Sequence, residues 1–346
     1  VLILLYIHSV RTIFNKKIPP TVCECIPSFS AHLALLRPLE ILFRFVTSRL
    51  RVLPDIIVLG EVRCGTTSLC NHLSSLQDFD CQEPFCLWAH PELDKKETFY
   101  FVGHYLGMCH PSTYPMCFPL KLSKKWNQVK FRIKSFFCRN KYKHELPSHP
   151  FFTFDGCAQY LTSPTAPYMI AEAYRLANEP PPVLIACVRD PVQQAVSWWK
   201  YENNAISWGE SMGLTEWNIK LRSEAYPPKS ISEALAFSQS TFVRESYEKA
   251  ERLVSTKIDE GILPPWAMTW PAGQLGSIGR SGNFSSNIQR YERVFKSYFS
   301  EPNQETVQEN ANRLSYVSVI PIEFLSDDNK LNDTLLSILN KAALRR

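Results

Sequence analysis

The sequence has few glycines and no long apolar run, and both absences limit what the chain can be. Only 12 of its 346 residues are Gly, against 25 Pro, so we expect stiff loops. No uncharged apolar stretch approaches the length of about 20 residues that a membrane-spanning helix needs. With 45% hydrophobic and 21% charged residues, the chain has the composition of a folded globular protein. A disordered chain, a collagen-like repeat and a polytopic membrane protein are therefore excluded.

The chain contains 11 Cys but no CxxC pair, which argues against a zinc ribbon or a thioredoxin-like site. No metal-ligand spacing is recognisable, so no metal is expected. Five of the cysteines, from Cys81 to Cys138, fall in a loop-rich stretch where disulfides would form in an oxidising compartment. The alternative is that most of the cysteines are small buried apolar groups. The cysteines alone do not decide the redox compartment.

The first 50 residues differ from the rest of the chain. Residues 1–7 are apolar, and two interpretations stay open: the end of a signal anchor that begins upstream of residue 1, or a short buried helical turn. Residues 31–50 are apolar but include Arg, Glu and Pro, which favours an amphipathic helix over a membrane span. We expect residues 1–50 to form an N-terminal stem or anchor-proximal segment, and residues 51–346 to form one large domain.

From residue 54 onward, short β-branched apolar runs alternate with helical patterns. The predicted strands are residues 55–60, 151–154, 182–188 and 316–325, and the predicted helices are residues 66–76, 191–201 and 331–344. This alternation favours a P-loop-like α/β fold of three layers, in which helices flank a central parallel sheet. Residues 120–145, basic and aromatic, and residues 203–282, which mix Trp, Pro and Gly, fit the pattern poorly. We expect both to be insertions that carry binding loops.

The strongest motif is the loop that joins the first strand to the first helix. It reads Gly60-Glu61-Val62-Arg63-Cys64-Gly65-Thr66-Thr67, and its glycines permit a tight turn and a close approach of backbone N–H groups to an anion. The glycine spacing matches the nucleoside-triphosphate loop GxxxxGK[ST], but Thr66 stands in place of the lysine, which argues against γ-phosphate transfer. A capped turn without a ligand is the alternative. The candidate anion-binding residues are Arg63, Cys64, Gly65, Thr66, Thr67 and Ser68.

A second motif follows the strand at residues 182–188. The tripeptide Arg189-Asp190-Pro191 leads into a helix that carries Ser197. A guanidinium and a hydroxyl one helix turn apart can clamp a phosphate, and ligands of open α/β sheets bind at the carboxyl ends of strands. Taken alone, the tripeptide could instead be a salt-bridged helix cap. Trp198 and Trp199 could stack on a ligand or belong to the core.

Together, the two motifs resemble the nucleotide-binding landmarks of sulfotransferases. That family has a 5′-phosphosulfate loop, in which a lysine closely precedes Gly-Thr-Thr, and a later strand that ends in Arg-Asp-Pro with a Ser eight residues after the Arg. The resemblance implies the donor 3′-phosphoadenosine 5′-phosphosulfate (PAPS), with Arg63 in the phosphosulfate loop and with Arg189 and Ser197 at the 3′-phosphate. It runs from about residue 54 to residue 344 and includes residues 282–295, which resemble a late helix of the family.

Another segment is similar to Golgi carbohydrate sulfotransferases of the heparan sulfate and chondroitin type. Residues 95–101, KKETFYF, resemble their Lys-Glu-x-x-Phe-Phe segment, whose glutamate is the proposed base. The resemblance therefore implies that Glu97, together with Arg63, is catalytic; Glu83, at a more usual spacing, is the alternative base. Gly156 stands where many members carry a lysine near the sulfonate, and Arg63 replaces the other lysine. These two departures change the positively charged groups that, in the family, stabilise the charge of the transferring sulfonate.

These resemblances imply a PAPS-dependent sulfotransferase that moves a sulfuryl group to a hydroxyl or amine of a carbohydrate or polysaccharide acceptor. They also imply a type II protein of the Golgi lumen and membrane, in which the sequons at Asn283 and Asn332 would be meaningful. Two alternatives stay open: a degenerate relative that binds glycan or nucleotide without turnover, and a P-loop kinase. No nucleic-acid partner is expected.

The net charge of +5 is unevenly distributed along the chain. Residues 121–143 hold nine Lys or Arg and no acidic residue, so the other residues carry 29 basic against 33 acidic side chains, or −4. Beside a sulfotransferase-like core, we expect this segment to bind an anionic polysaccharide acceptor in a salt-sensitive way. A solvated basic loop is the alternative.

Overall fold

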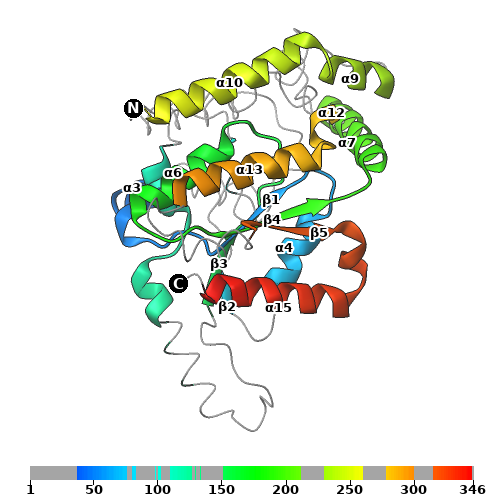
Figure 1. Ribbon diagram of the computed structural model, residues 1–346. Helices are drawn as coiled ribbons and strands as arrows, with labels where there is room; N and C mark the ends of the chain where they lie inside the picture. Colours follow the sequence, from blue (N-terminus) through cyan, green and yellow to red (C-terminus); the bar gives the residue numbers. More distant parts are fainter. Residues whose placement is uncertain are drawn as a thin grey trace, which may run out of the picture.

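The computed structural model describes residues 37–75, 80–82, 98, 100–102, 110–126, 129, 133, 151–211, 230–259, 278–299 and 315–344. Within them, five strands form one sheet in which every neighbouring pair is parallel (Figure 1). The strands are β1 (Ile56–Gly60), β2 (Asp80–Gln82), β3 (Phe151–Asp155), β4 (Val183–Val188) and β5 (Val317–Pro321). Their order across the sheet is β2-β3-β1-β4-β5, which places β1 in the centre.

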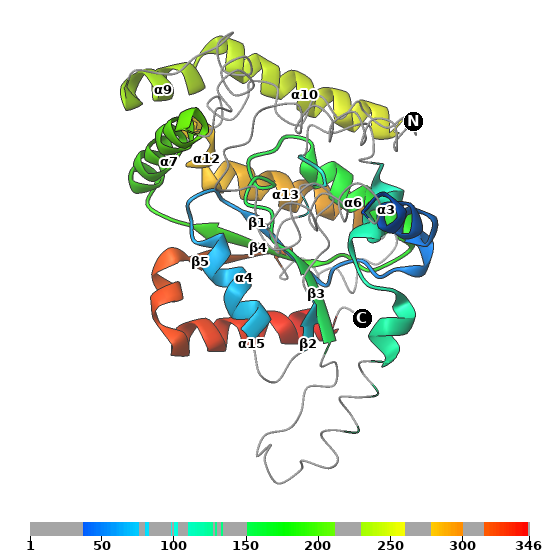
Figure 2. The same cartoon turned by 180° about the vertical axis from the view of Figure 1, so that it is seen from behind.

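Helices cover both faces of this sheet, as Figures 1 and 2 show from opposite sides. One face carries α4 (Thr66–Ser75) and α15 (Asp328–Leu344), and the other carries α6 (Ala166–Ala177), α13 (Phe284–Phe299) and η4 (Pro111–Cys117). Two helices, α9 (Ile231–Ser238) and α10 (Thr241–Asp259), lie outside α13, and α7 (Pro191–Ser211) and α12 (Ile278–Ser281) lie close to α9. The remaining helical elements are α3 (Arg37–Val46), η3 (Ser48–Leu50) and η6 (Ile322–Ser326).

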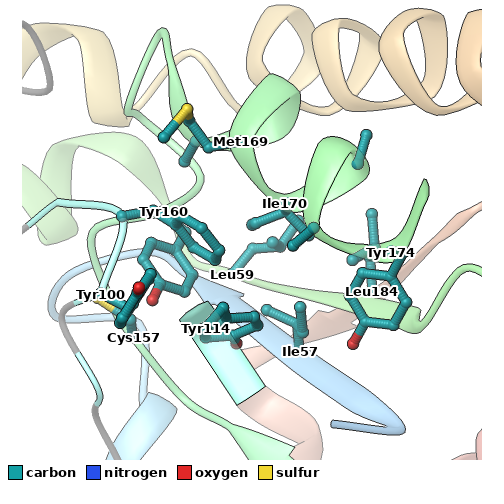
Figure 3. Packing of buried hydrophobic residues seen from close by; sticks show 14 of the residues in the cluster. Ile57, Leu59, Tyr100, Tyr114, Cys157, Tyr160, Met169, Ile170, Tyr174 and Leu184 are labelled. Carbon is teal, nitrogen blue, oxygen red and sulfur yellow. The ribbon is translucent and has the colours of Figure 1, made fainter. Parts of the chain in front are cut away.

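The central strand β1 is buried on both faces because its side chains alternate between two hydrophobic cores. Ile56 and Val58 pack with leucines of α4 and α15, whereas Ile57 and Leu59 pack with α6 and the tyrosine-rich cluster in Figure 3. All four side chains are inaccessible to solvent. Since burying such a side chain contributes about 1.5–3 kcal/mol, this continuous apolar run is stable only in the middle of the sheet.

The direction of the connections reverses beside β1. After β1 the chain crosses to β2 on one side of the sheet, whereas after β3 and again after β4 it moves toward the other side. The loops that leave the carboxyl ends of β1 and β4 therefore diverge, and such a divergence is where open α/β sheets bind ligands. Both predicted motifs lie in these two loops.

The predicted fold class is confirmed: a central parallel sheet is flanked by helices on both faces. The predicted strands correspond to β1, β3, β4 and β5, although β5 ends at Pro321 and the chain continues as η6. The short strand β2 was not predicted, because three residues carry too little pattern.

Residues 203–282, expected to lack periodicity, are helical in much of their described part. They include the end of α7 and all of α9, α10 and α12. α10 buries Val243, Tyr247, Ala250 and Val254, whose helical spacing the prediction overlooked. These helices pack on α6 and on one another rather than on the sheet.

The described N-terminal residues form the amphipathic helix that was predicted within residues 31–50. α3 carries an internal ion pair between Arg44 and Glu40 at 3.0 Å, and it leaves Phe43 and Val46 exposed. No helix in the described ranges is long and apolar enough to cross a membrane. The prediction for residues 1–7 lies outside the described residues.

The described start of the basic segment lies at the amino end of the sheet. Lys124 forms an ion pair with the buried carboxylate of Asp55 at 3.4 Å, and Lys121 pairs with Glu179 at 3.3 Å. Asp55 immediately precedes β1, so both contacts lie at the edge opposite the loop after β1. Two cations of this segment therefore bind the protein's own carboxylates. Most of residues 127–143 lie outside the described residues.

Five cysteines have a described environment, and all five are buried free thiols: Cys64, Cys70, Cys117, Cys157 and Cys187. For these five, burial as small apolar groups is confirmed over disulfide formation.

Candidate functional site

The loop after β1 makes a turn that needs unusual backbone conformations. Gly60 has φ +116° and Gly65 has φ +85°, both in the region that favours glycine. A Cβ on Gly60 would lie 2.3 Å from the carbonyl oxygen of Ala158, so a side chain has no room there. Arg63 adopts φ +64°, a left-handed conformation that costs a non-glycine residue about 1–3 kcal/mol and that clusters at functional sites.

Three hydrogen bonds connect this loop to the end of β4 and to the loop and helix that follow it. The N–H of Glu61 donates to the carbonyl of Cys187 at 3.1 Å, and Nη1 of Arg189 donates to the carbonyl of Arg63 at 3.3 Å. From α7, Nε2 of Gln194 donates to the carbonyl of Val62 at 3.0 Å. The two predicted motifs thus form one site at the carboxyl ends of β1 and β4.

The cationic side chains of the two motifs meet at this site. Nε of Arg63 donates to Oγ of Ser197 at 3.2 Å, and the Arg63 guanidinium lies 5.1 Å from the ring centroid of Tyr201. Nε of Arg189 is shielded from solvent and has no hydrogen-bond partner. An unsatisfied buried donor of this kind is a place for an anionic oxygen. The structure therefore brings Arg63 together with Arg189 and Ser197, which lie 126 and 134 positions further along the sequence.

The other predicted loop residues lie where the loop becomes α4. Cys64 and Thr66 are buried, whereas Thr67 and Ser68 are exposed in the first turn. Burial raises the pKa of the Cys64 thiol, so this residue supports the loop as a neutral apolar group. The first N–H groups of a helix lack intrahelical partners, and with the two exposed hydroxyls they offer hydrogen bonds to an anion.

The start of α7 explains the remaining residues of the second motif. Oδ1 of Asp190 accepts a hydrogen bond from the N–H of Gln193 at 2.8 Å. This carboxylate therefore caps the N-terminus of α7, which accounts for Asp190 without a ligand. Trp198 is buried against Ala195 and Ala234 and belongs to the core. Of the two uses considered for this tryptophan, stacking on a ligand is therefore wrong.

A buried acid beside the loop was not predicted. Glu61 has no exposed surface; its carboxyl group accepts hydrogen bonds from the N–H of Val62 at 3.1 Å and from the hydroxyl of Thr162. Desolvation raises the pKa of Glu61 to about 8, although both hydrogen bonds and the charge of Arg290 act against that rise. The only sequence signal was a charged residue directly after a buried strand. Glu61 is mostly protonated at neutral pH and does not oppose an anion in the loop.

The predicted bases Glu97 and Glu83 lie outside the described residues, but the residue after Glu97 is described. Thr98 is buried beside Asp155, the last residue of β3, and its N–H and its hydroxyl donate to the Asp155 carboxylate at 3.1 and 2.7 Å. The hydroxyls of Tyr114 and Tyr160 donate to the same carboxylate at 2.7 and 3.0 Å. Asp155 therefore organises the chain beside the site, and burial raises its pKa.

The junction of α12 and α13 also contacts the site. Nε2 of Gln194 donates a second hydrogen bond to Oγ of Ser281 at 3.1 Å. Further along α13, the hydroxyl of Tyr291 donates to the carbonyl of Tyr160 at 2.8 Å. The charge of Arg290, beside Tyr291, is felt by the Glu61 carboxyl group. The residues of α12 and α13 thus lie next to the loop after β1.

Neither a scan against protein families nor a search of curated proteins finds a match for this chain. Among solved structures, the chain is similar to a sulfotransferase from Alicyclobacillus acidocaldarius, with a TM-score of 0.36 and 15% sequence identity. That match covers 85% of this chain and 81% of the other. A likeness at this TM-score carries no argument, so the assignment of the site rests on its own residues and geometry.

Proposed function

We propose that this chain is a sulfotransferase that binds PAPS across the loops after β1 and β4. It would transfer the sulfuryl group to a hydroxyl or amine of a carbohydrate acceptor. The observation that carries the proposal is the contact of Arg63 with both Ser197 and Arg189, which are 134 and 126 positions away in the sequence. Two motifs that resemble two ends of one donor-binding site thus meet in space.

The chemistry of these residues suits a donor with several anionic oxygens. Arg63 and Arg189 supply two guanidinium groups, and the first turn of α4 supplies backbone N–H groups and the hydroxyls of Thr67 and Ser68. The unpartnered Nε of Arg189 would be satisfied by a phosphate oxygen. In the described ranges no group of three or more His, Cys, Asp or Glu is placed to hold a metal ion.

Each residue then has a defined part in the reaction. When bound, the donor supplies the sulfuryl group and departs as adenosine 3′,5′-bisphosphate. Arg63 and the loop N–H groups stabilise the negative charge that develops on the departing phosphate, while Arg189 and Ser197 hold the 3′-phosphate. Glu97 accepts the proton of the acceptor hydroxyl.

Calorimetric titration with adenosine 3′,5′-bisphosphate tests the binding site. Arg189→Ala should weaken binding at least tenfold, because a charged hydrogen bond contributes about 1.5–3 kcal/mol. Arg252→Ala is the matched control, since this arginine is exposed on α10 and outside the site. An unchanged affinity in Arg189→Ala would contradict the site, and binding of Mg-ATP in place of the bisphosphate would favour the kinase.

Transfer of radioactive sulfate to a polysaccharide panel tests the chemistry. Glu97→Gln should reduce the rate by about 10²–10⁴-fold and leave bisphosphate binding unchanged, since only the proton acceptor is removed. If Glu83→Gln has this effect instead, Glu83 is the base. A wild-type protein that binds the donor but transfers nothing would favour the degenerate relative.

A further inference from the structure

A second group of arginines lies on α10, α12 and α13, next to the proposed donor site. A cavity of about 480 Å³ lies among these helices and the end of α9. Figure 1 shows the arrangement of the four helices. Four arginines and two glutamates line it: Arg244, Arg280, Arg290, Arg293, Glu248 and Glu251. Its other lining residues are uncharged polar residues and one glycine, so it offers hydrogen bonds and charge but no apolar wall.

Two of the four arginines form no ion pair with these two glutamates. Arg293 pairs with Glu251 at 2.7 Å, and Arg244 pairs loosely with Glu248 at 4.0 Å. In the described part of the chain, no carboxylate lies within ion-pair distance of Arg280 or Arg290. The cavity therefore carries an excess of positive charge at these two residues.

The environments of Arg280 and Arg290 are those of cations that lack a counter-ion. The Arg280 guanidinium lies 4.4 Å from the ring centroid of Tyr247. Desolvation and the charge of Arg290 lower the pKa of Arg280, and the opposing effects of Tyr247, Glu248 and Glu251 do not cancel this lowering. Arg290 donates to Oδ1 of Asn287, but its Nε is shielded from solvent and has no partner. Keeping two like charges partly buried is unfavourable unless an anion binds between them.

The chemistry of the lining identifies the class of ligand. Guanidinium groups bind carboxylates and sulfate esters through paired hydrogen bonds, and amides and hydroxyls bind sugar hydroxyls. A steroid, phenol or other flat apolar acceptor would find no complementary surface among the lining residues. The ligand that fits is an acidic saccharide.

The position of the cavity relates it to the transfer reaction. Gln194 connects the loop after β1 to Ser281, and Ser281 adjoins the cavity residues Arg280 and Asn283. By contrast, the described lysines of the basic segment 121–143 lie at the opposite edge of the sheet, where Lys124 pairs with Asp55. An acceptor held at the cavity is next to the donor loop.

We propose that Arg280 and Arg290 bind an acidic group, a carboxylate or a sulfate ester, of the acceptor saccharide in this cavity. That the saccharide is the acceptor of the reaction rests on the proposed sulfotransferase function. The binding of an acidic saccharide in the cavity does not depend on that function. The two arginines give the acceptor its charge specificity and hold it beside the donor loop.

Affinity for a chondroitin sulfate hexasaccharide, measured by calorimetry at low salt, tests this site. Arg280→Gln and Arg290→Gln should each weaken binding about ten- to a hundredfold, the effect of losing a charged hydrogen bond. Arg252→Gln, an exposed arginine of α10 outside the cavity, should bind as the wild type does. A neutral hexasaccharide, prepared by desulfation and carboxyl reduction, should bind all four proteins equally weakly. Thermal unfolding checks that each variant folds.

Titration of the same variants with adenosine 3′,5′-bisphosphate separates this proposal from the proposed function. Unchanged bisphosphate affinity in Arg280→Gln and Arg290→Gln supports a separate acceptor site. Loss of bisphosphate binding with normal hexasaccharide binding overturns it, because the cavity would then belong to the nucleotide. Equal hexasaccharide affinity in wild type and both variants also overturns it. If the wild type binds the hexasaccharide through these arginines but does not bind the bisphosphate, the saccharide site stands and the sulfotransferase function fails.

Discussion

The buried carboxyl group of Glu61 should make the stability of this protein depend on pH in a way that one substitution removes. Its pKa is raised from 4.5 to about 8 by burial, so the folded protein holds a proton that the unfolded chain releases above pH 4.5. The stability that this proton confers is complete below pH 4.5 and is lost as the pH rises through 8. Between pH 5 and pH 8 the loss amounts to roughly 3–4 kcal/mol of unfolding free energy.

Glu61→Gln tests this reasoning, because glutamine has the same shape, does not ionise, and can hydrogen-bond to Val62 and Thr162. Urea unfolding at pH 5, 6, 7 and 8 should show a steep fall in stability for the wild type and a fall smaller by roughly 3–4 kcal/mol for the variant. Glu245→Gln, an exposed glutamate of α10, is the matched control and should retain the wild-type slope. Equal slopes in wild type and Glu61→Gln would refute the buried, proton-holding state of Glu61.

Two further predictions concern the backbone of the donor loop and the basic segment. Gly60→Ala should lower the free energy of unfolding by about 3 kcal/mol or more, because the new Cβ meets the Ala158 carbonyl at an unfavourable φ. Gly65→Ala should cost less in the same denaturation assay, since the atom that its Cβ would meet is a side-chain methyl of Leu325 that can move. Lys124→Met should destabilise the protein by about 3 kcal/mol, because the buried Asp55 carboxylate loses its cation. Lys125→Met, at an exposed position, should have almost no effect, and a similar loss in both variants would contradict a specific role for Lys124.

The parts of the fold and site that the sequence predicted are those set by short local patterns. An apolar β-branched run followed by a glycine loop and a helix was sufficient to locate β1, the loop and α4. The strand β4, which directly precedes Arg189, was predicted from the same kind of apolar β-branched run. Because parallel strands share one carboxyl edge, the meeting of Arg63 with Arg189 and Ser197 followed from placing both motifs at strand ends.

The parts that were missed depend on partners far away in the sequence. Glu61 is buried because of Thr162, about 100 positions later, and no local pattern distinguishes it from a surface glutamate. Arg280 and Arg290 form a site only once α10 packs beside α13. In the sequence, the four arginines of the cavity are separate residues with no pattern that joins them. Lys124 belonged to a run that looked like a solvated or ligand-binding arm, whereas its partner Asp55 lies before the first strand.

The central place of β1 has a consequence for how the chain is made. Its two neighbours, β3 and β4, lie roughly 90 and 130 residues further along the chain. At a synthesis rate of about 5–20 residues per second, β1 waits for some 6 to 25 seconds before both of its neighbours have been synthesised. During that time a strand of continuous apolar residues has both edges unpaired, which is the condition for wrong pairing and aggregation. Production of this protein should therefore depend on rapid completion of the chain or on chaperones that cover β1 until its neighbours arrive.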